Sequence, residues 1–444
     1  MNNSKSISRR KFIKTASIAG AGLSIAFSAK SYSSIIGSND KVRMAVIGLN
    51  GRGKALFGAI TKSKNAVVSH VCDVDKRTIT EMLKMTEEIY GLKPQAETDF
   101  RKILENKDID AVAIATPDHW HAPMTIMAVS TGKDVYVEKP CSHNPHEGEL
   151  LISAQKKYGK VIQMGTQQRS ADTSIEAIQD IHNGLIGDAY YGRAWYANNR
   201  KSIGLGKPVA VPAELNWELW QGPAPRKAYH DNWVHYNWHW FWNWGTGEIN
   251  NNGTHEIDIC RWALGVDFPV EVNSSGGRYA FKDDWQFYDT QVANYQFPEE
   301  KMITWEGRSC NSFPEQGWGR GSAIYGTKGT VLIDRNNYRA YDLDGKLIKE
   351  LKEKEESATT NTIGEGALDV NHMNNFLDAI RENKKLHSPI EVGHITNTLC
   401  HLGNIAQATG RKLAIDPENG KILNDDQAMK MWSRDYEPGW EPRF

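Results

Sequence analysis

The feature that most constrains the fold is a short apolar run that leads straight into a glycine-rich turn and then into a helical pattern. The run at 42–47 is apolar and β-branched, as in a buried parallel strand. The turn GLNGRG follows at 48–53, and the apolar residues of 54–62 recur at helical spacing. Strand, glycine turn and helix in this order predict the first βαβ unit of a dinucleotide-binding domain, with the pyrophosphate at the helix N-terminus.

The glycine turn matches the dinucleotide fingerprint G-x-G-x-x-G imperfectly. Gly48 and Gly53 fit this register, whereas Asn50 stands where the middle glycine is expected. Asparagine is the non-glycine residue that best tolerates a positive φ, so we expect the loop to bind with slightly altered geometry. The loop residues expected to contact the cofactor are Gly48, Asn50, Gly51, Arg52 and Gly53.

The next strand supports this interpretation and indicates which dinucleotide is bound. The run at 66–72 ends at Asp73, which lies 20 residues after Gly53. An acid at this spacing binds the ribose hydroxyls and disfavours a 2′-phosphate. The sequence therefore favours NAD, while the nearby bases Lys76 and Arg77 keep NADP open as the alternative.

Three further apolar runs, at 111–115, 134–137 and 160–165, predict more strands of the same parallel sheet. Ligands bind beyond the carboxyl ends of such strands. Lys139, fixed before Pro140 at one of these ends, is a candidate cation for stabilising a developing alkoxide. The cofactor contacts expected at these strand ends are Thr116, Pro117, His121, Glu138, Lys139 and Gln167.

Together, the glycine turn, TPDHWH at 116–121, EKP at 138–140 and GTQQR at 165–169 resemble the Gfo/Idh/MocA oxidoreductases, the group of glucose–fructose oxidoreductase and inositol dehydrogenase. The resemblance covers about 41–410. It implies a Rossmann domain with a doubly wound parallel sheet, followed by an α+β domain with a large, mostly antiparallel open sheet. It also implies tightly bound NAD(P), a carbohydrate substrate and pairing of open sheets in a homo-oligomer. We expect the Rossmann domain at 39–165 and the substrate domain at 166–444.

A second stretch of that family, of the form G-G-x-x-x-x-D-x-G-x-H-x-x-D, corresponds to 245–258. The resemblance places His255 at the general acid/base position. It places Asn251 at the position of the catalytic aspartate. An amide cannot take a proton, but it can still hydrogen-bond to a substrate hydroxyl.

The segment 217–244 holds seven of the fifteen tryptophans, interleaved with His230, His235 and His239. Aromatic faces suit the C–H faces of a pyranose ring, and Asn and His can bind its hydroxyls. A packing layer or a subunit contact is the alternative for any one tryptophan. The substrate contacts expected overall are Lys139, Arg169, Trp238, His239, Asn251 and His255.

Composition excludes other classes of protein. The chain has 53 Lys and Arg against 54 Asp and Glu, a net charge of −1, which argues against a nucleic-acid partner. It has no apolar run of about 18 residues, so we expect no membrane span. The five cysteines form no CxxC pair, and the pairs His119/His121 and His235/His239 lack acidic or thiolate partners nearby. We therefore expect no metal site and at least one unpaired thiol.

The N-terminal segment is distinct from the rest of the chain. Residues 1–38 carry six bases and no acid, and SRRKFIK at 8–14 precedes a mild apolar stretch at 15–27. This layout resembles a twin-arginine signal peptide, which implies export of the folded protein to the periplasm with its cofactor inserted. A basic tail or a short uncleaved anchor is the alternative.

Three functions follow from these residues. The first is oxidation of a secondary hydroxyl of a sugar or glycoside, with His255 as base and Lys139 stabilising the alkoxide. The second is NAD-dependent glycoside hydrolysis, as in the α-N-acetylgalactosaminidase relatives of the family, with His235 or His239 as an extra base. The third is a non-catalytic sugar-binding protein, which the departures at Asn50 and Asn251 would suit.

Overall fold

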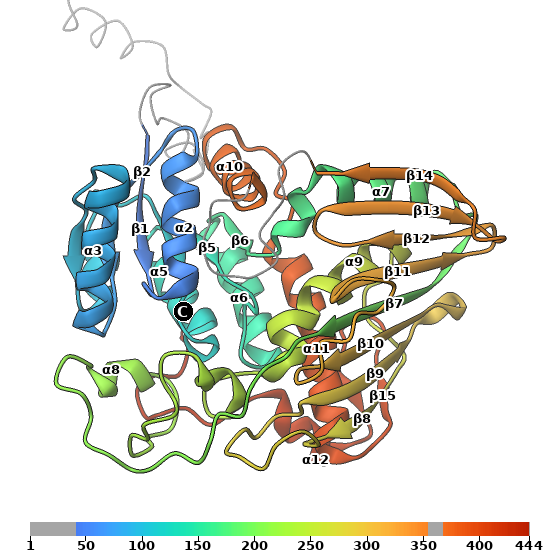
Figure 1. The fold of residues 1–444 in the computed structure, drawn as a ribbon. Helices are drawn as coiled ribbons and strands as arrows, with labels where there is room; N and C mark the ends of the chain where they lie inside the picture. Colours follow the sequence, from blue (N-terminus) through green and yellow to red (C-terminus); the bar gives the residue numbers. More distant parts are fainter. Residues whose placement is uncertain (1–40, 354–366, 444) are drawn as a thin grey trace, which may run out of the picture. The chain divides into compact units, whose positions relative to one another are not determined.

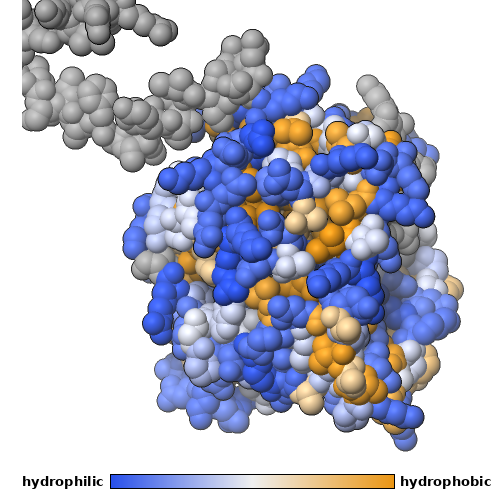
Figure 2. Space-filling model, turned by 90° about the vertical axis from the view of Figure 1, so that its left-hand side faces the viewer, coloured by the Kyte–Doolittle hydropathy of each residue, from blue (hydrophilic) through white to orange (hydrophobic). Residues whose placement is uncertain are grey.

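A computed structural model describes residues 41–353 and 367–443. The expected signal segment, 1–38, lies outside the described residues. No helix in the described ranges is long and apolar enough to cross a membrane. The side of the protein drawn in Figure 2 is mostly hydrophilic, and hydrophobic residues gather in a band across its middle.

The first sheet is entirely parallel, and its strand order is β3-β2-β1-β4-β5-β6. This is the order of a doubly wound Rossmann domain, so the predicted fold of the N-terminal half is confirmed. Its strands are β1 (Val42–Ile47), β2 (Ala66–Cys72), β3 (Gln95–Glu97), β4 (Ala111–Ile114), β5 (Asp134–Val137) and β6 (Ile162–Met164). The helices along this half are α2 (Gly51–Lys62), α3 (Lys76–Tyr90), α4 (Phe100–Glu105), α5 (Asp118–Ser130) and α6 (Pro145–Tyr158).

The second sheet has ten strands in the order β14-β13-β12-β11-β7-β10-β9-β8-β15-β16. Only the β7–β10 pair is parallel, so the predicted large, mostly antiparallel sheet is confirmed. The strands are β7 (Ala189–Ala197), β8 (Glu271–Gly277), β9 (Thr290–Gln296), β10 (Met302–Arg308), β11 (Arg320–Gly326), β12 (Gly329–Ile333), β13 (Asn337–Asp342), β14 (Leu347–Lys352), β15 (Leu413–Ile415) and β16 (Ile422–Leu423). Helices α7 (Asp172–His182), α9 (Thr254–Leu264) and α11 (Ile390–Thr409) pack against this sheet and bury its core (Figure 1).

One late helix returns to the first sheet. Helix α10 (Ala367–Glu382) lies beside α2 (Figure 1). Its residues Met373, Phe376 and Leu377 are buried in one core with strands β1 and β2. The C-terminal part of the chain therefore completes the core of the dinucleotide-binding half.

The tryptophan-rich segment contains α8 (Trp217–Gln221) and the short 3₁₀ helix η3 (Asn237–Trp240). Most of its tryptophans pack on one another: Trp217 stacks on Trp220 with ring centroids 4.7 Å apart, and Trp233 meets Trp244 edge-on at 4.5 Å. The packing alternative therefore applies to most of these rings. They form a small core of their own, which holds in place a segment whose only regular elements are these two short helices among residues 217–244.

Candidate active site

A cavity of about 370 Å³ lies at the carboxyl ends of β1, β2, β4 and β5 and is bounded on its other side by the tryptophan-rich segment and α9. Almost all residues expected from the sequence to bind cofactor or substrate line it. They are Gly48, Asn50, Gly51, Arg52, Asp73, Thr116, Pro117, His121, Glu138, Lys139, Gln167, Trp238, His239, Asn251 and His255. Gly53 and Arg169 do not line it.

The glycine turn has the close contacts that a dinucleotide loop requires. Gly48 has a φ of 87°, and a Cβ there would lie 2.6 Å from the carbonyl oxygen of Ala115. A Cβ on Gly53 would lie 1.8 Å from the carbonyl oxygen of Gly48, so Gly53 allows α2 to pack on the turn and does not itself face the cavity. Asn50 is extended, with a φ of −76°, so the expected use of its tolerance for positive φ is wrong.

Asp73 is fixed against this turn. One carboxylate oxygen accepts from the backbone N–H of Leu49 at 2.8 Å, and the other accepts from the backbone N–H of Asp75 at 3.0 Å. Burial raises the pKa of Asp73, and the two N–H groups oppose that effect. A carboxylate held here, at the edge of the cavity, fits the ribose hydroxyls of NAD.

Glu138 links three of the loops that were expected to hold the cofactor. It accepts from Nε of Arg52 at 2.7 Å and from Nε2 of Gln167 at 3.0 Å. Arg52 also donates to both oxygens of Asp369, at 2.6 and 3.1 Å, from the start of α10. The guanidinium of Arg52 is thus held by two carboxylates, and these contacts fix its position.

Lys139 points from the end of β5 towards the segment that precedes α9. Its Nζ donates to the backbone oxygen of Asn251 at 2.5 Å and to the Oδ1 of the same residue at 3.1 Å. Burial lowers the pKa of Lys139 to about 8, although Glu138 and Asp118 oppose this effect. The ammonium is therefore held by neutral acceptors inside the cavity, where it can also donate to a substrate oxygen.

Asn251 lies in a π-helical turn, η4 (Ile249–Gly253), a distortion that often marks functional sites. Its Nδ2 donates to Oε1 of Glu248 at 3.2 Å, so its amide contacts the Lys139 ammonium on one side and a carboxylate on the other. Glu248 is itself held by Nε of Arg200 at 2.6 Å and by the hydroxyl of Ser309 at 3.1 Å. An aspartate at 251 could not donate to Glu248, which explains physically why an amide suits this chain.

His255 lies in the first turn of α9, directly after η4. Its side chain is buried, with 4% of the residue exposed, and its Nδ1 has no hydrogen-bond partner within the described part of the chain. Burial, and then the charges of Arg335 and Lys139, hold the pKa of His255 well below its usual range. The imidazole is thus neutral at physiological pH and can accept a proton.

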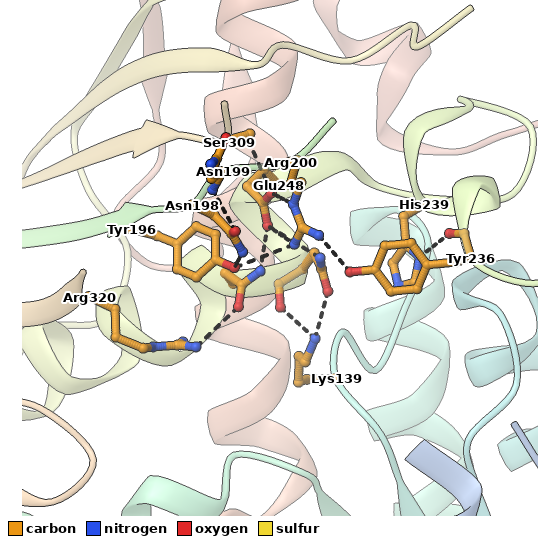
Figure 3. A network of polar contacts seen from close by, with 12 residues as sticks. Lys139, Tyr196, Asn198, Asn199, Arg200, Tyr236, His239, Glu248, Ser309 and Arg320 are labelled. Atoms are coloured by element: carbon orange, nitrogen blue, oxygen red, sulfur yellow. Dashed lines mark hydrogen bonds and ion pairs between the residues drawn. The ribbon is translucent and has the colours of Figure 1, made fainter. Parts of the chain in front are cut away.

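Trp238 and His239 form an aromatic wall of the cavity. Their rings stack with centroids 3.6 Å apart, and Nδ1 of His239 lies 2.6 Å from the backbone oxygen of Tyr236. The hydroxyl of Tyr236 accepts from Arg200 at 2.7 Å, and Arg200 in turn holds Glu248, so this wall joins their polar network (Figure 3). Trp220 lines the cavity as well.

Arg169 is a correction to the sequence-based site. Its guanidinium forms two hydrogen bonds with Asp258, at 2.6 and 3.0 Å, and lies 4.8 Å from the ring of Trp262. Both charges are buried away from the cavity, so Arg169 joins η2 (Gln167–Ser170) to α9 and does not contact substrate from this position.

Two histidines are engaged differently from the sequence expectation. His235 lies 2.8 Å from Oδ2 of Asp75, near the end of the cavity formed by Asp73, so its ring is already paired. His121 faces two backbone oxygens, those of Pro140 at 2.6 Å and Thr116 at 2.7 Å, and holds the strand-end loops together. Over residues 41–353 and 367–443, no group of three or more His, Cys, Asp or Glu side chains is placed to bind a metal ion.

Four residues that line the cavity or support its lining carry no motif in the sequence. Arg200, Glu248 and Asp369 position the residues named above, and Arg335 faces the cavity from the second sheet. Their partners are distant in the chain: Asp369 is 317 residues from Arg52. Only Glu248 had a usable indication, because it stands within the stretch that contains Asn251 and His255.

Two models of one oxidoreductase family match the chain. The model of the NAD-binding Rossmann fold of the Gfo/Idh/MocA family matches residues 42–166. The model of the family's C-terminal α/β domain matches residues 191–293 and 333–441. These ranges contain the first sheet, part of the second sheet, and the cavity residues Lys139 and His255.

Among curated proteins, a "Glycosyl hydrolase family 109 protein" of Saccharopolyspora erythraea is 26% identical over 259 residues, which are 52% of this chain and 56% of that protein. The chain spans about half the length of the curated relatives that it matches first. Two solved structures share the fold. An aldose-aldose oxidoreductase from Caulobacter crescentus, complexed with glycerol, has a TM-score of 0.64 at 19% identity and covers 84% of this chain and 100% of its own. A levoglucosan dehydrogenase, in complex with NADH and levoglucosan, has a TM-score of 0.66 at 18% identity, with coverage of 84% and 99%.

Proposed function

Because the chain belongs to the Gfo/Idh/MocA oxidoreductase family and has its NAD-binding Rossmann domain, we propose that it oxidises a secondary hydroxyl of a sugar or glycoside with tightly bound NAD. The observation that carries this proposal is the meeting of Lys139 and His255 in one cavity at the strand ends. A neutral imidazole can take the proton of an alcohol and an ammonium can stabilise the alkoxide, while bound NAD would accept the hydride.

The cofactor has a prepared place in this chain. The turn at Gly48 would hold the diphosphate at the N-terminus of α2, and Asp73 would bind the adenosine ribose. Thr116 and Pro117 would border the nicotinamide ribose. Bound there, NAD supplies the hydride acceptor.

The side chains of the cavity perform the remaining steps of the proposed reaction. The ammonium of Lys139 donates to the hydroxyl oxygen of the substrate, which lowers the pKa of that hydroxyl and stabilises the alkoxide. His255 takes the hydroxyl proton, while the carbon gives up its hydride, so the alcohol becomes a ketone. Trp238 and His239 stack on and hydrogen-bond to the sugar ring. The sugar dehydrogenase and aldose oxidoreductase that share the fold are consistent with a carbohydrate substrate.

We further propose that the twin-arginine segment directs the folded protein to the periplasm. No free NAD pool is available there, so the cofactor must be regenerated in the site. Reduction of a second sugar, or return of the hydride to the first, would achieve this. The open second sheet is the surface through which we expect a homo-oligomer to form.

The second candidate is glycoside hydrolysis through the same first step, and the names of the curated relatives favour it. Oxidation at one carbon acidifies the neighbouring C–H. Loss of that proton expels the aglycone, water adds across the double bond, and the hydride returns, so no net redox change results. The extra base would be His239, which lines the cavity, because His235 is paired with Asp75.

The test starts from the purified protein. Denaturation should release NAD, and a screen of sugars and nitrophenyl glycosides should give either a keto-sugar with absorbance at 340 nm or a free aglycone with bound NAD unchanged. Lys139→Met should lower turnover by about 10²-fold or more. The matched control is Lys107→Met, at an exposed lysine far from the cavity.

Three results decide between the functions. A keto-sugar supports the oxidoreductase, and an aglycone supports the hydrolase. A sugar that binds without yielding either product supports the non-catalytic alternative and overturns both. Undiminished turnover in Lys139→Met or His255→Gln would remove these residues from the mechanism.

A further inference from the structure

Arg335 is a cation of the cavity that the proposed reaction does not use. It lies in the turn between β12 and β13 and lines the cavity together with Lys139 and His255. Within the ranges that the structure describes, its guanidinium forms no hydrogen bond and no ion pair. A guanidinium has five N–H donors, so leaving it partly buried and unpaired is unfavourable.

The two carboxylates that act most strongly on Arg335 are each paired with another arginine, although Oε2 of Glu256 has no hydrogen-bond partner among the described residues. Glu256 accepts from Arg320 at 2.7 Å, and Asp369 is held by Arg52 at 2.6 Å. Burial, and then repulsion by Arg320, lower the pKa of Arg335 to about 9, although Glu256 and Asp369 oppose this. Among the residues that the structure describes, Arg335 is therefore a desolvated cation that faces the cavity without an ion-pair partner.

The position of Arg335 favours the substrate over the cofactor as the missing partner. Among the charges that lower the pKa of His255, that of Arg335 is the largest, ahead of that of Lys139. Arg335 thus lies on the side of the proposed base. The diphosphate of a dinucleotide is expected instead at the glycine turn, where Arg52 is already committed to Glu138 and Asp369.

We propose that the substrate is an acidic sugar and that Arg335 binds its oxyanion. The planar fork of a guanidinium matches a carboxylate or a sulfate ester with two parallel hydrogen bonds. Lys139 and His255 then act on a hydroxyl while Arg335 fixes the acidic substituent, so Arg335 determines specificity. This inference rests on the proposed function, since it names the substrate class of the same site.

The experiment compares sugars that differ only in charge. The probes are the methyl glycosides of glucose, galactose and mannose, their uronates and their 6-sulfates. Binding to the NAD-loaded protein is measured by calorimetry, and product formation is measured in parallel. At least one acidic sugar should bind tenfold or more tightly than its neutral counterpart, and comparing uronate with 6-sulfate identifies the oxyanion.

Three variants test whether the guanidinium of Arg335 causes the preference for acidic sugars. Arg335→Gln should remove the preference, so that the acidic sugar binds no more tightly than its neutral counterpart, and Arg335→Lys should keep the preference only in part. The matched control is Arg339→Gln. Arg339 lies in β13, four residues after Arg335, and this variant breaks its ion pair with Glu350 of β14. It should leave the preference intact.

Four results would overturn the inference. They are equal binding of acidic and neutral sugars, binding of none of the acidic sugars, a preference that persists in Arg335→Gln, and loss of bound NAD in Arg335→Gln. The last would assign Arg335 to the cofactor. Arg335-dependent binding of an acidic sugar without keto-sugar or aglycone would reject the proposed function and leave this inference standing.

Discussion

The substitution Asn251→Asp tests how this chain sets the charge state of Lys139. It places a carboxylate oxygen 3.1 Å from the Lys139 ammonium and 3.2 Å from the carboxylate of Glu248. At an effective dielectric constant of about 20, a full charge at either distance interacts by roughly 5 kcal/mol. The attraction to Lys139 and the repulsion from Glu248 therefore nearly cancel in stability, but only the attraction raises the pKa of Lys139.

The sign of the pH effect follows from the proposed role. Lys139 acts as a protonated donor, so activity should fall as the pH rises through its pKa of about 8. Asn251→Asp should move this alkaline limb upwards by at least one pH unit. That is well below the shift that 5 kcal/mol would give at 1.36 kcal/mol per unit, because Glu248 keeps the new carboxylate partly protonated.

The assay is kcat against pH from about 6.5 to 10, with the sugar that the screen identifies. Asn252→Asp is the control, because Asn252 also contacts Glu248 but its Oδ1 accepts from Arg320 at 3.2 Å, not from Lys139. It adds the same charge and should leave the limb in place. An alkaline limb that stays fixed in Asn251→Asp, or that moves equally in both variants, would refute the reasoning.

Three further predictions follow from single contacts. Asp73→Ser should weaken retention of NAD by about tenfold and admit NADP, seen in the nucleotide released on denaturation; unchanged retention would mean that other groups hold the ribose. Arg169→Met leaves Asp258 buried without its ion-pair partner, so it should lower the free energy of unfolding, measured in urea, by about 3–5 kcal/mol and leave the KM unchanged. A raised KM with unchanged stability would instead show that Arg169 contacts the substrate. Trp238→Ala should raise the KM for the sugar several-fold while the protein still carries its NAD; an unaltered KM would limit Trp238 to packing.

The sequence alone determined the dinucleotide-binding half and most of the cavity lining. The strand, glycine turn and helix at 42–62, and Asp73 at its spacing, are local patterns whose geometry follows from chain order. The residues after β4 and β5 came together as expected, because the carboxyl ends of parallel strands meet at one edge of the sheet. The tryptophan-rich segment was placed at the cavity, but which rings face it was not determined by the pattern.

Only the tertiary structure decided how the charged residues pair. Arg169 was expected to bind substrate and instead forms an ion pair with Asp258, while Arg335 was not expected in the site at all. The structure explains why residue 251 is an amide, because Asn251 accepts from Lys139 on one side and donates to Glu248 on the other. The sequence pattern around a charged side chain does not indicate its partner. The partner depends on how the two sheets and the returning helix α10 pack, and it can lie far away in the chain. Lys139 and Asn251, for example, are 112 residues apart.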